Sequence, residues 1–399
     1  MLNNRRTQSN AVIVIPTYNE ADNIGQMIDY LNTKTFPSLP SKWNMKILVV
    51  DGNSPDGTGK VVTDKSKKWK NTYLYTETSK DGIGAAYLKG FKYAMDELQA
   101  DFVFEFDGDF QHPPESIPVM LNALDEGYDY VIGSRKIEGG SNPKGWGFKR
   151  VFFSEVGGFM ARFIMFFPLK TFFRVTDPTT GLKVTRVKGF IDQLDLDYSH
   201  LLTKSFYYKF QLLFETLKMK AKFKEIPLEF HVRNAGESKI EASAPIEALR
   251  VAFLLRWRDD LTQKFIKFAI VGGVGFIVNI VGGRIFKNLL GSVILSISLL
   301  NGIANALAAE LSIISNFTWN NVWTFSQEKI TGSDKIIPKF LTFNASSAIT
   351  GIAIPSAVIS LLTYLFGDHF LIYQVIAIFT LTIPLNWIVY NKFIWKKNK

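Results

Sequence analysis

Cysteine is absent from the 399 residues of this sequence. Its absence excludes disulfide bonds and a thiol nucleophile, and it fits a reducing compartment. The first ten residues, MLNNRRTQSN, are polar and lack the apolar segment of a secretory signal peptide. Charged residues are also scarce, but only within residues 264–395. The chain therefore divides into a basic half of α/β type, residues 1–260, and an apolar half.

The net charge of the chain is +10 at pH 7. Such an excess can indicate nucleic-acid binding, but here it is combined with an apolar half. Attraction to anionic lipid and to phosphorylated substrates is the better interpretation, and we expect no nucleic-acid partner.

Short apolar runs alternate with helical patterns in the first half of the chain. The runs 11–15, 46–50, 72–75 and 102–106 are predicted strands, and we expect Pro16 to end the first ladder. This alternation predicts a mostly parallel sheet that binds ligands at the carboxyl ends of its strands. The loops that follow three of these strands would then meet at one edge.

The fourth predicted strand ends at two carboxylates one residue apart, Asp107 and Asp109, followed by Gln111. Carboxylates at this spacing can both turn toward one hard cation. With an amide oxygen and water they would suit Mg²⁺ or Mn²⁺ bound together with substrate phosphates. Solvated strand-end carboxylates are the alternative, but the long apolar strand before them favours the metal site.

Eight segments, in this order, carry a family resemblance: IPTYNEADNI, VVDGNSPDGTG, GIGAAYLKGFKYA, DGDFQHPPE, IGSRKIEGG, DPTTGLKV, YKFQLLFETL and FHVRNAGESK. They resemble the dolichyl-phosphate mannose synthases, inverting glycosyltransferases of family 2 with a GT-A fold. The resemblance implies a catalytic domain at residues 1–240. It also implies metal-dependent transfer of mannose from GDP-mannose to the phosphate of dolichol or another polyprenol, with a β-linked product.

The resemblance further implies the residues of the site. The catalytic residues would be Asp107, Asp109 and Arg135. The metal ligands would be Asp107, Asp109 and Gln111. The acceptor phosphate would contact Arg135, Lys149, Arg150, Ser154 and Arg233. The nucleotide sugar would contact Pro16, Tyr18, Glu20, Val50, Asp51, Asp107, Gly108, Asp109, Arg135, Lys209, Arg233 and Lys239.

One position departs from this family, which usually has two adjacent acids after the second strand. Here Asp51 is followed by Gly52, so the choice between GDP and UDP stays open. A polyprenyl phosphate is already an anion near neutral pH, because the second pKa of a phosphate monoester is about 6. It needs no general base, so we interpret Asp177 as a turn former and His112 as a packed or loop-capping residue.

Two further segments of the first half suit a membrane surface. Residues 148–173 are rich in aromatic side chains yet carry five charges, which predicts a helix or helix pair in the headgroup plane, with a core helix as the alternative. A second amphipathic interface helix is predicted at residues 241–263, where Arg256, Trp257 and Arg258 form a basic, aromatic edge.

Four apolar segments predict a transmembrane domain of two hairpins at residues 264–399: 265–286, 294–318, 340–366 and 370–391. The domain resembles the small GtrA-like membrane proteins that are sometimes fused to polyprenyl-phosphate glycosyltransferases. Lysines in its middle loop and tail predict that both termini and the catalytic domain are cytoplasmic, in a protein of the cell membrane. Glu310, the acid well inside a span, is a candidate functional residue.

Three alternatives remain. The same chemistry could use UDP-glucose. A processive polysaccharide synthase would need a Gln-x-x-Arg-Trp signature, which is absent because Phe253 stands where the glutamine would be. The chain could also be a glycolipid flippase or channel whose first half only senses nucleotide. The sequence does not indicate an oligomeric state.

Overall fold

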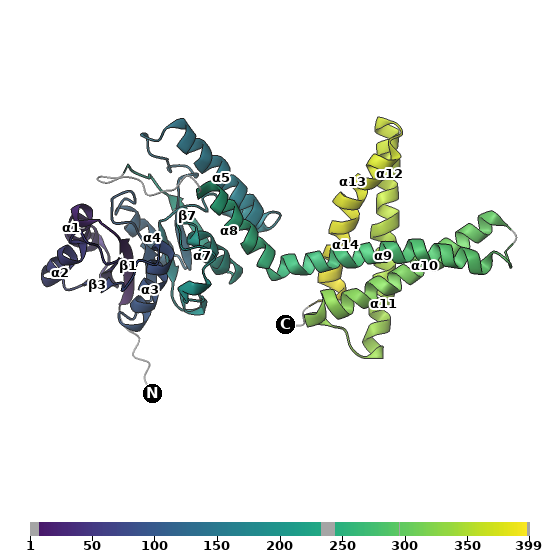
Figure 1. Ribbon diagram of the computed structural model, residues 1–399, viewed down its shortest axis with the longest axis horizontal. Helices are drawn as coiled ribbons and strands as arrows, with labels where there is room; N and C mark the ends of the chain where they lie inside the picture. The colour runs from purple at the N-terminus through teal and green to yellow at the C-terminus, as the bar shows by residue number, and fades with distance from the viewer. Residues whose placement is uncertain (1–7, 233–243, 295, 397–399) are drawn as a thin grey trace. The chain divides into compact units, whose positions relative to one another are not determined.

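A computed structural model describes residues 8–232, 244–294 and 296–396 (Figure 1). The chain divides between Trp257 and Arg258 into two compact units. The first unit contains a sheet covered by helices, and the second contains helices alone.

The first unit is built on a seven-stranded sheet with the order β3-β2-β1-β4-β6-β5-β7. All neighbouring strands run parallel except β6, which is antiparallel to both β4 and β5. The predicted mostly parallel sheet is therefore confirmed. Its strands are β1 (Ser9–Thr17), β2 (Trp43–Asp51), β3 (Thr72–Thr76), β4 (Phe102–Glu105), β5 (Tyr130–Ser134), β6 (Lys183–Arg186) and β7 (Phe223–Pro227).

The prediction that Pro16 ends the first ladder is wrong. Pro16 and Thr17 still pair with β2, opposite Val50 and Asp51. On the other side of β1, pairing with β4 ends at Val14. At position 16, β1 is paired on one side only, so no hydrogen bond to β4 is lost when proline lacks a backbone N–H. Proline is therefore tolerated there.

Helices cover both faces of the sheet. One face packs against α1 (Ala21–Tyr30), α2 (Thr58–Lys68) and α4 (Ser116–Asp125), and alternate residues of β1 such as Ile13 point into this layer. The opposite face packs against α3 (Ile83–Asp96) and α7 (Tyr208–Lys218), with Val14 on that side. This is the three-layer arrangement expected when parallel strands are buried on both faces.

A third cluster forms beside the sheet from α5 (Phe148–Phe166), α6 (Lys170–Arg174), α7 and α8 (Ala244–Arg258) (Figure 1). Helix α5 contributes Ala161, Met165 and Phe166 to this core, but many of its aromatic side chains are exposed. The exposed ones are Phe148, Phe152, Phe153, Phe159 and Phe163. The predicted helix pair at 148–173 therefore has one packed side and one uncovered aromatic side within the described chain.

The second unit contains four helices long and apolar enough to cross a membrane: 260–290, 297–324, 333–366 and 372–394. The four predicted spans are confirmed. They comprise α9 (Asp260–Leu290), α10 (Ile297–Trp319), α11 (Ser333–Ala348), α12 (Ile354–Phe366), α13 (Phe370–Ala377) and α14 (Ile383–Val389), with single π-helical turns where consecutive helices continue each other.

Aromatic residues near the ends of these spans form a small core. The rings of Phe325 and Trp395 stack at 4.5 Å between centroids. Asn321 joins the same cluster, because its Oδ1 accepts hydrogen bonds from Ile330 N at 2.8 Å and from Trp395 Nε1 at 3.0 Å. Farther along α10, Glu310 accepts two hydrogen bonds from Asn344 of α11, at 2.8 and 3.0 Å. A helix-packing contact thus involves the acid proposed from the sequence, and its functional role stays a prediction.

Candidate active site

The carboxyl ends of β1, β2 and β4 carry the predicted nucleotide and metal residues. Asp51, at the end of β2, accepts hydrogen bonds from Thr17 Oγ1 at 3.0 Å and Ser54 Oγ at 2.6 Å. Gly52 N donates to Thr17 O at 2.9 Å. These bonds join the loops after β1 and β2, so Asp51 holds that part of the edge together from a buried position.

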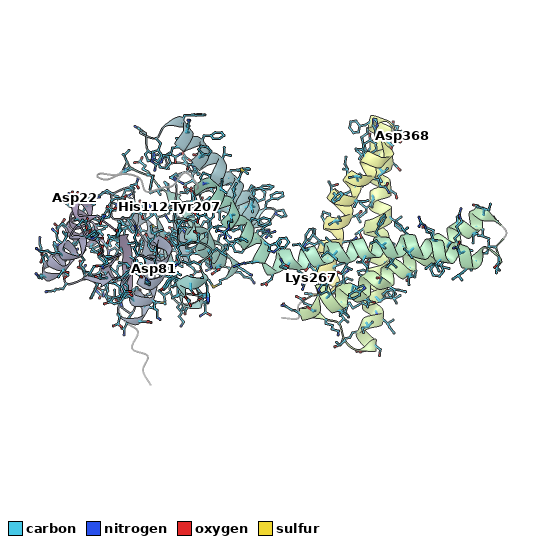
Figure 2. The ribbon with its side chains drawn as sticks, viewed as in Figure 1. Asp22, Asp81, His112, Tyr207, Lys267 and Asp368 are labelled. Atoms are coloured by element: carbon cyan, nitrogen blue, oxygen red, sulfur yellow. The ribbon has the colours of Figure 1, made fainter. Side chains whose placement is uncertain are left out.

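The loop after β4 is closed by the side chains of the predicted metal motif. Asp109 is buried, and its Oδ1 accepts a hydrogen bond from Gln111 N at 3.1 Å. His112 Nδ1 accepts from Asp107 N at 3.0 Å, which fits the predicted loop-capping role. Burial lowers the pKa of His112 to about 4, although Asp107 opposes the shift, so the ring is neutral at physiological pH. Figure 2 labels His112 within the first unit.

Asp107, Asp109 and Gln111 fit a hard cation in ligand type, because all three offer oxygen. In residues 8–232, 244–294 and 296–396, no group of three histidine, aspartate or glutamate side chains could hold a metal ion. A cation at this loop would therefore depend on two carboxylates, an amide oxygen and oxygens from substrate or water.

Arg135 follows β5 and is paired with Asp177. Its Nε and Nη2 lie 2.7 and 2.8 Å from the two carboxylate oxygens, and both side chains are almost fully buried. Burial alone would raise the pKa of Asp177, but Arg135 holds it down to about 2. Asp177 is therefore more than the turn former expected from the sequence: it fixes a guanidinium in a planar, bidentate pair.

The antiparallel direction of β6 explains how Asp177 reaches this edge. Because β6 runs against its neighbours, its amino end lies beside the carboxyl ends of β4 and β5, with Lys183 opposite Glu105 and Ile132. The segment that leads into β6, residues 177–182, is thereby placed at the same edge as the loops that follow the parallel strands.

Three separate segments converge at Gly181. A Cβ built on this glycine would lie 2.6 Å from Lys209 Nζ and 2.8 Å from His112 Cε1. Lys209, in the first turn of α7, is buried, and its Nζ has no hydrogen-bond partner in the described part of the chain. Burial lowers the pKa of Lys209 to about 8, with the charge of Asp107 opposing the shift. A buried ammonium without a polar partner is a fitting position for a substrate phosphate.

Sequence reasoning missed a buried charged group beneath this edge. Glu105 Oε2 accepts a hydrogen bond from Tyr208 OH at 2.8 Å and lies 3.8 Å from Lys183 Nζ. Lys183 also donates to the backbone carbonyl of Lys209 at 3.3 Å. The available signal was Glu105, a charged residue inside the otherwise apolar strand β4. This group links β4 to α7, the helix that carries Lys209.

The predicted acceptor residues of α5 lie in its first two turns. Arg150 is placed over the Trp146 ring, with 4.1 Å between its Cζ and the ring centroid. Burial lowers the pKa of Arg150, and the charge of Arg135 adds to the shift, so the two guanidinium groups are near each other. Neighbouring cations of this kind favour an anion between them. Lys149 and Ser154 lie on the same helix, whereas Arg233 and Lys239 lie outside the described residues.

The remaining predicted nucleotide residues line the β1 and β2 end of the edge. Pro16 and Val50 are opposite each other in the sheet. The Tyr18 ring lies under Lys80 Nζ, at 3.6 Å from its centroid. Glu20 Oε2 accepts from Asn23 Nδ2 at 2.9 Å. Gly108 has little room for a side chain, because a Cβ there would be 3.0 Å from Ile15 Cγ2.

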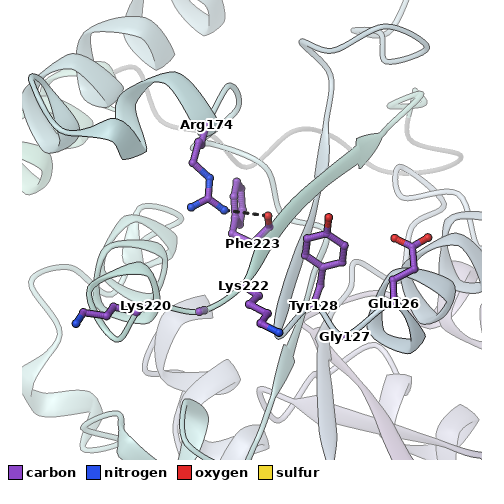
Figure 3. Close-up of a pocket in the computed structure, with 8 residues that line it drawn as sticks. Glu126, Gly127, Tyr128, Arg174, Lys220, Lys222 and Phe223 are labelled. Carbon is purple, nitrogen blue, oxygen red and sulfur yellow. Dashed lines mark hydrogen bonds between the residues drawn. The ribbon is translucent and has the colours of Figure 1, made fainter.

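An open hollow of about 520 Å³ is lined by Arg174, Lys220, Lys222 and residues 126–128 (Figure 3). It lies at the amino ends of β5 and β7, since Tyr128 precedes β5 and Phe223 begins β7. The carboxylates and cations described above are at the opposite edge, so this hollow is not part of the candidate active site.

Residues 12–190 match glycosyl transferase family 2, and residues 267–395 match the GtrA/DPMS transmembrane domain. The protein is therefore a glycosyltransferase with a membrane domain. The dolichol-phosphate mannosyltransferase of Pyrococcus furiosus is 30% identical over 387 residues, 96% of this chain and 98% of that protein. The chain belongs to the polyprenyl-phosphate mannosyltransferases of glycosyltransferase family 2, as its sequence motifs predict.

Other similarities cover less of the chain. The undecaprenyl-phosphate mannosyltransferase of Micrococcus luteus is 31% identical over 244 residues, 61% of this chain and 92% of that protein. Among solved structures, mannosyl-3-phosphoglycerate synthase from Rubrobacter xylanophilus has a TM-score of 0.46 at 18% identity, covering 64% of this chain and 76% of its own. That structural likeness is too weak to bear on function.

We predict that Gly181→Ala lowers the rate of sugar transfer by about 100-fold, because the added methyl group displaces Lys209 Nζ and His112, and small misplacements in a site have effects of this size. The thermal midpoint should fall as well, because the buried ring of His112 must shift, so the rate is measured at a temperature where the variant is folded. Gly302→Ala is the control, because nothing lies within 4 Å of a Cβ at that position. An unchanged rate in Gly181→Ala would contradict a role for this convergence.

Proposed function

We propose that the protein transfers mannose from GDP-mannose to the phosphate of dolichol or a similar polyprenol, with inversion, at the cytoplasmic face of the membrane. The product is dolichyl β-D-mannosyl phosphate. One observation carries the proposal: a single edge of the sheet holds two carboxylates suited to a cation together with Arg135, Arg150 and Lys209. Two phosphorylated substrates need such a site, because their negative charges repel each other.

The chemistry of the described residues also favours an acceptor that is already ionised. His112 is neutral but its Nδ1 accepts from Asp107 N, and Asp177 is held by Arg135. Neither side chain is available to remove a proton from a sugar hydroxyl. A phosphate monoester needs no such removal near neutral pH.

The reaction is a single displacement. An oxygen of the acceptor phosphate forms a bond to the anomeric carbon, and the bond from that carbon to the donor diphosphate breaks, with GDP leaving with the electron pair. Attack opposite the leaving group converts an α-linked donor into a β-linked product. Arg135 and Arg150 would orient the acceptor phosphate, and Lys209 would stabilise the departing diphosphate.

A divalent cation at Asp107, Asp109 and Gln111 would supply positive charge to the diphosphate. Mg²⁺ or Mn²⁺ suits this set of oxygen ligands. The chain's own contribution is the loop geometry: Asp109 is fixed by Gln111 N, and His112 caps Asp107 N.

The membrane segments support placement of the site near lipid. The exposed phenylalanines of α5 lie on the helix that carries Lys149 and Arg150, so one helix presents both apolar and cationic side chains. Lysines flank the spans on the side of the catalytic half, at positions 264, 267, 329, 335 and 339. By the positive-inside rule this side faces the cytoplasm.

The direct test supplies purified protein with a polyprenyl phosphate and a panel of GDP- and UDP-sugars. We expect GDP-mannose to be used in preference to UDP-glucose, and the NMR coupling of the product to report a β linkage. An unphosphorylated polyprenol should be inert, because it lacks the anionic nucleophile. An α-linked product, or a preference for UDP-glucose, would contradict the proposal.

Removal of the metal should stop the reaction. We expect a chelator to abolish transfer and added Mg²⁺ or Mn²⁺ to restore it. Asp109→Asn keeps an oxygen for the hydrogen bond from Gln111 N but loses the charge, so its rate should fall about 100-fold or more at an unchanged thermal midpoint. Asp64→Asn, at an exposed position of α2, is the matched control. Wild-type turnover in Asp109→Asn would refute the metal assignment.

The orientation can be tested with single cysteines, because the chain has none of its own. Ser333→Cys is at the first residue of the third span, where the segment from the second span ends, and Ser292→Cys lies between the first and second spans. A membrane-impermeant maleimide should label Ser292→Cys in intact cells and Ser333→Cys only after permeabilisation. The reverse pattern would place the catalytic half on the outer side.

A further inference from the structure

The nucleobase end of the site lies toward β3. The order β3-β2-β1-β4 separates the ends of β3 and β4 by three strand spacings, about 14 Å in total. If the donor diphosphate lies at Asp107 and Asp109, as the proposed function requires, an extended nucleoside reaches across β1 and β2. Its base then comes close to the first residues after β3.

Glu77 is the first residue after β3, and its side chain is almost fully buried. Its backbone N donates to Asp51 O at 2.8 Å, which ties it to the end of β2. Its Oε1 lies 2.8 Å from Lys89 Nζ, and Lys89 also pairs with Asp81 at 2.7 Å. The ammonium of Lys89 thus holds one of the two carboxylate oxygens of Glu77 in place.

The other oxygen of Glu77 borders the position of Gly52. A Cβ built on Gly52 would lie 3.7 Å from Glu77 Oε2 and 3.3 Å from Tyr18 Cδ2. The carboxylate and the aromatic ring therefore both border the space that a side chain at position 52 would occupy. The Tyr18 ring is covered in this structure by the ammonium group of Lys80. Glycine at position 52 leaves this space open, and a methyl group there would press on the Tyr18 ring.

We propose that Glu77 recognises the base of the nucleotide donor and selects guanine, by accepting hydrogen bonds from the two adjacent N–H groups on its Watson–Crick edge. An ionised carboxylate only accepts hydrogen bonds, and its two oxygens match these neighbouring donors. Uracil offers one N–H between two carbonyl oxygens, which the carboxylate would repel. The acid that determines base choice is therefore supplied by the end of β3.

Glu77 could instead serve only to hold Lys89. Asp81 allows base recognition to be separated from support of Lys89. It contacts the same ammonium of Lys89, but it is placed at the start of α3 rather than at the Gly52 position. Glu77→Gln and Asp81→Asn each remove one negative charge from Lys89. A purely supporting role predicts that the two variants behave alike toward different bases.

The experiment measures binding of GDP, IDP and UDP to the full-length protein in detergent, by calorimetry in the presence of Mg²⁺. IDP differs from GDP only by the missing 2-amino group. We expect wild type and Asp81→Asn to prefer GDP over IDP by about 10-fold or more, as for a hydrogen bond to a charged group. In Glu77→Gln the GDP and IDP affinities should become nearly equal, with GDP losing most.

A second variant covers the case in which Glu77→Gln fails to fold. Gly52→Ala leaves Glu77 in place but adds a methyl group between it and Tyr18, so it should also reduce the preference for GDP over IDP. Retention of the full GDP preference in either folded variant would overturn the assignment of Glu77. A wild-type protein that binds UDP more tightly than GDP would instead refute the proposed donor, and the assignment with it.

Discussion

The buried pair of Arg135 and Asp177 is the interaction on which the site depends. An unpaired guanidinium or carboxylate at this depth would cost several kcal/mol, so neither residue is stable there without the other. The pair also joins two segments that meet only in the folded chain, the end of β5 and the segment before β6. Arg135 is thereby fixed before any substrate arrives, beside Arg150 and close to the loop of Asp107. The positive charge at this edge is therefore built into the fold rather than assembled on binding.

Much of the architecture could be predicted from the sequence because it is encoded locally. The apolar runs of β1, β2 and β4 and the four spans each carry their own signal. The antiparallel β6 could not be predicted, since strand pairing between residues 78 to 84 positions apart leaves no local pattern. For the same reason the sequence indicated that Asp177 forms a turn, but not that it holds Arg135. The ladder position of Pro16 depended on where β4 ends, which is also a tertiary property.

In the candidate site, too, residues in local motifs could be predicted, whereas residues that depend on tertiary contacts could not. Ordered motifs led to Asp107, Asp109, Arg135 and Lys209, because these stand in recognisable segments. Glu105 and Lys183 were missed, although a charged residue in a buried strand is itself a signal of a partner elsewhere. Glu77 was missed because its significance depends on Gly52, and the two approach only when β2 and β3 are aligned. Residues that act through others are harder to find than residues that carry a motif.

The strand β6 has a consequence for the spacing of charged groups at this edge. Because it separates β4 from β5, the tips that carry Asp107 and Arg135 are two strand spacings apart, about 10 Å. Direct pairing of β4 with β5 would halve that gap. The inserted strand thus keeps the carboxylates after β4 and the guanidinium after β5 apart, so these opposite charges do not neutralise each other directly and Arg135 is paired with Asp177 instead.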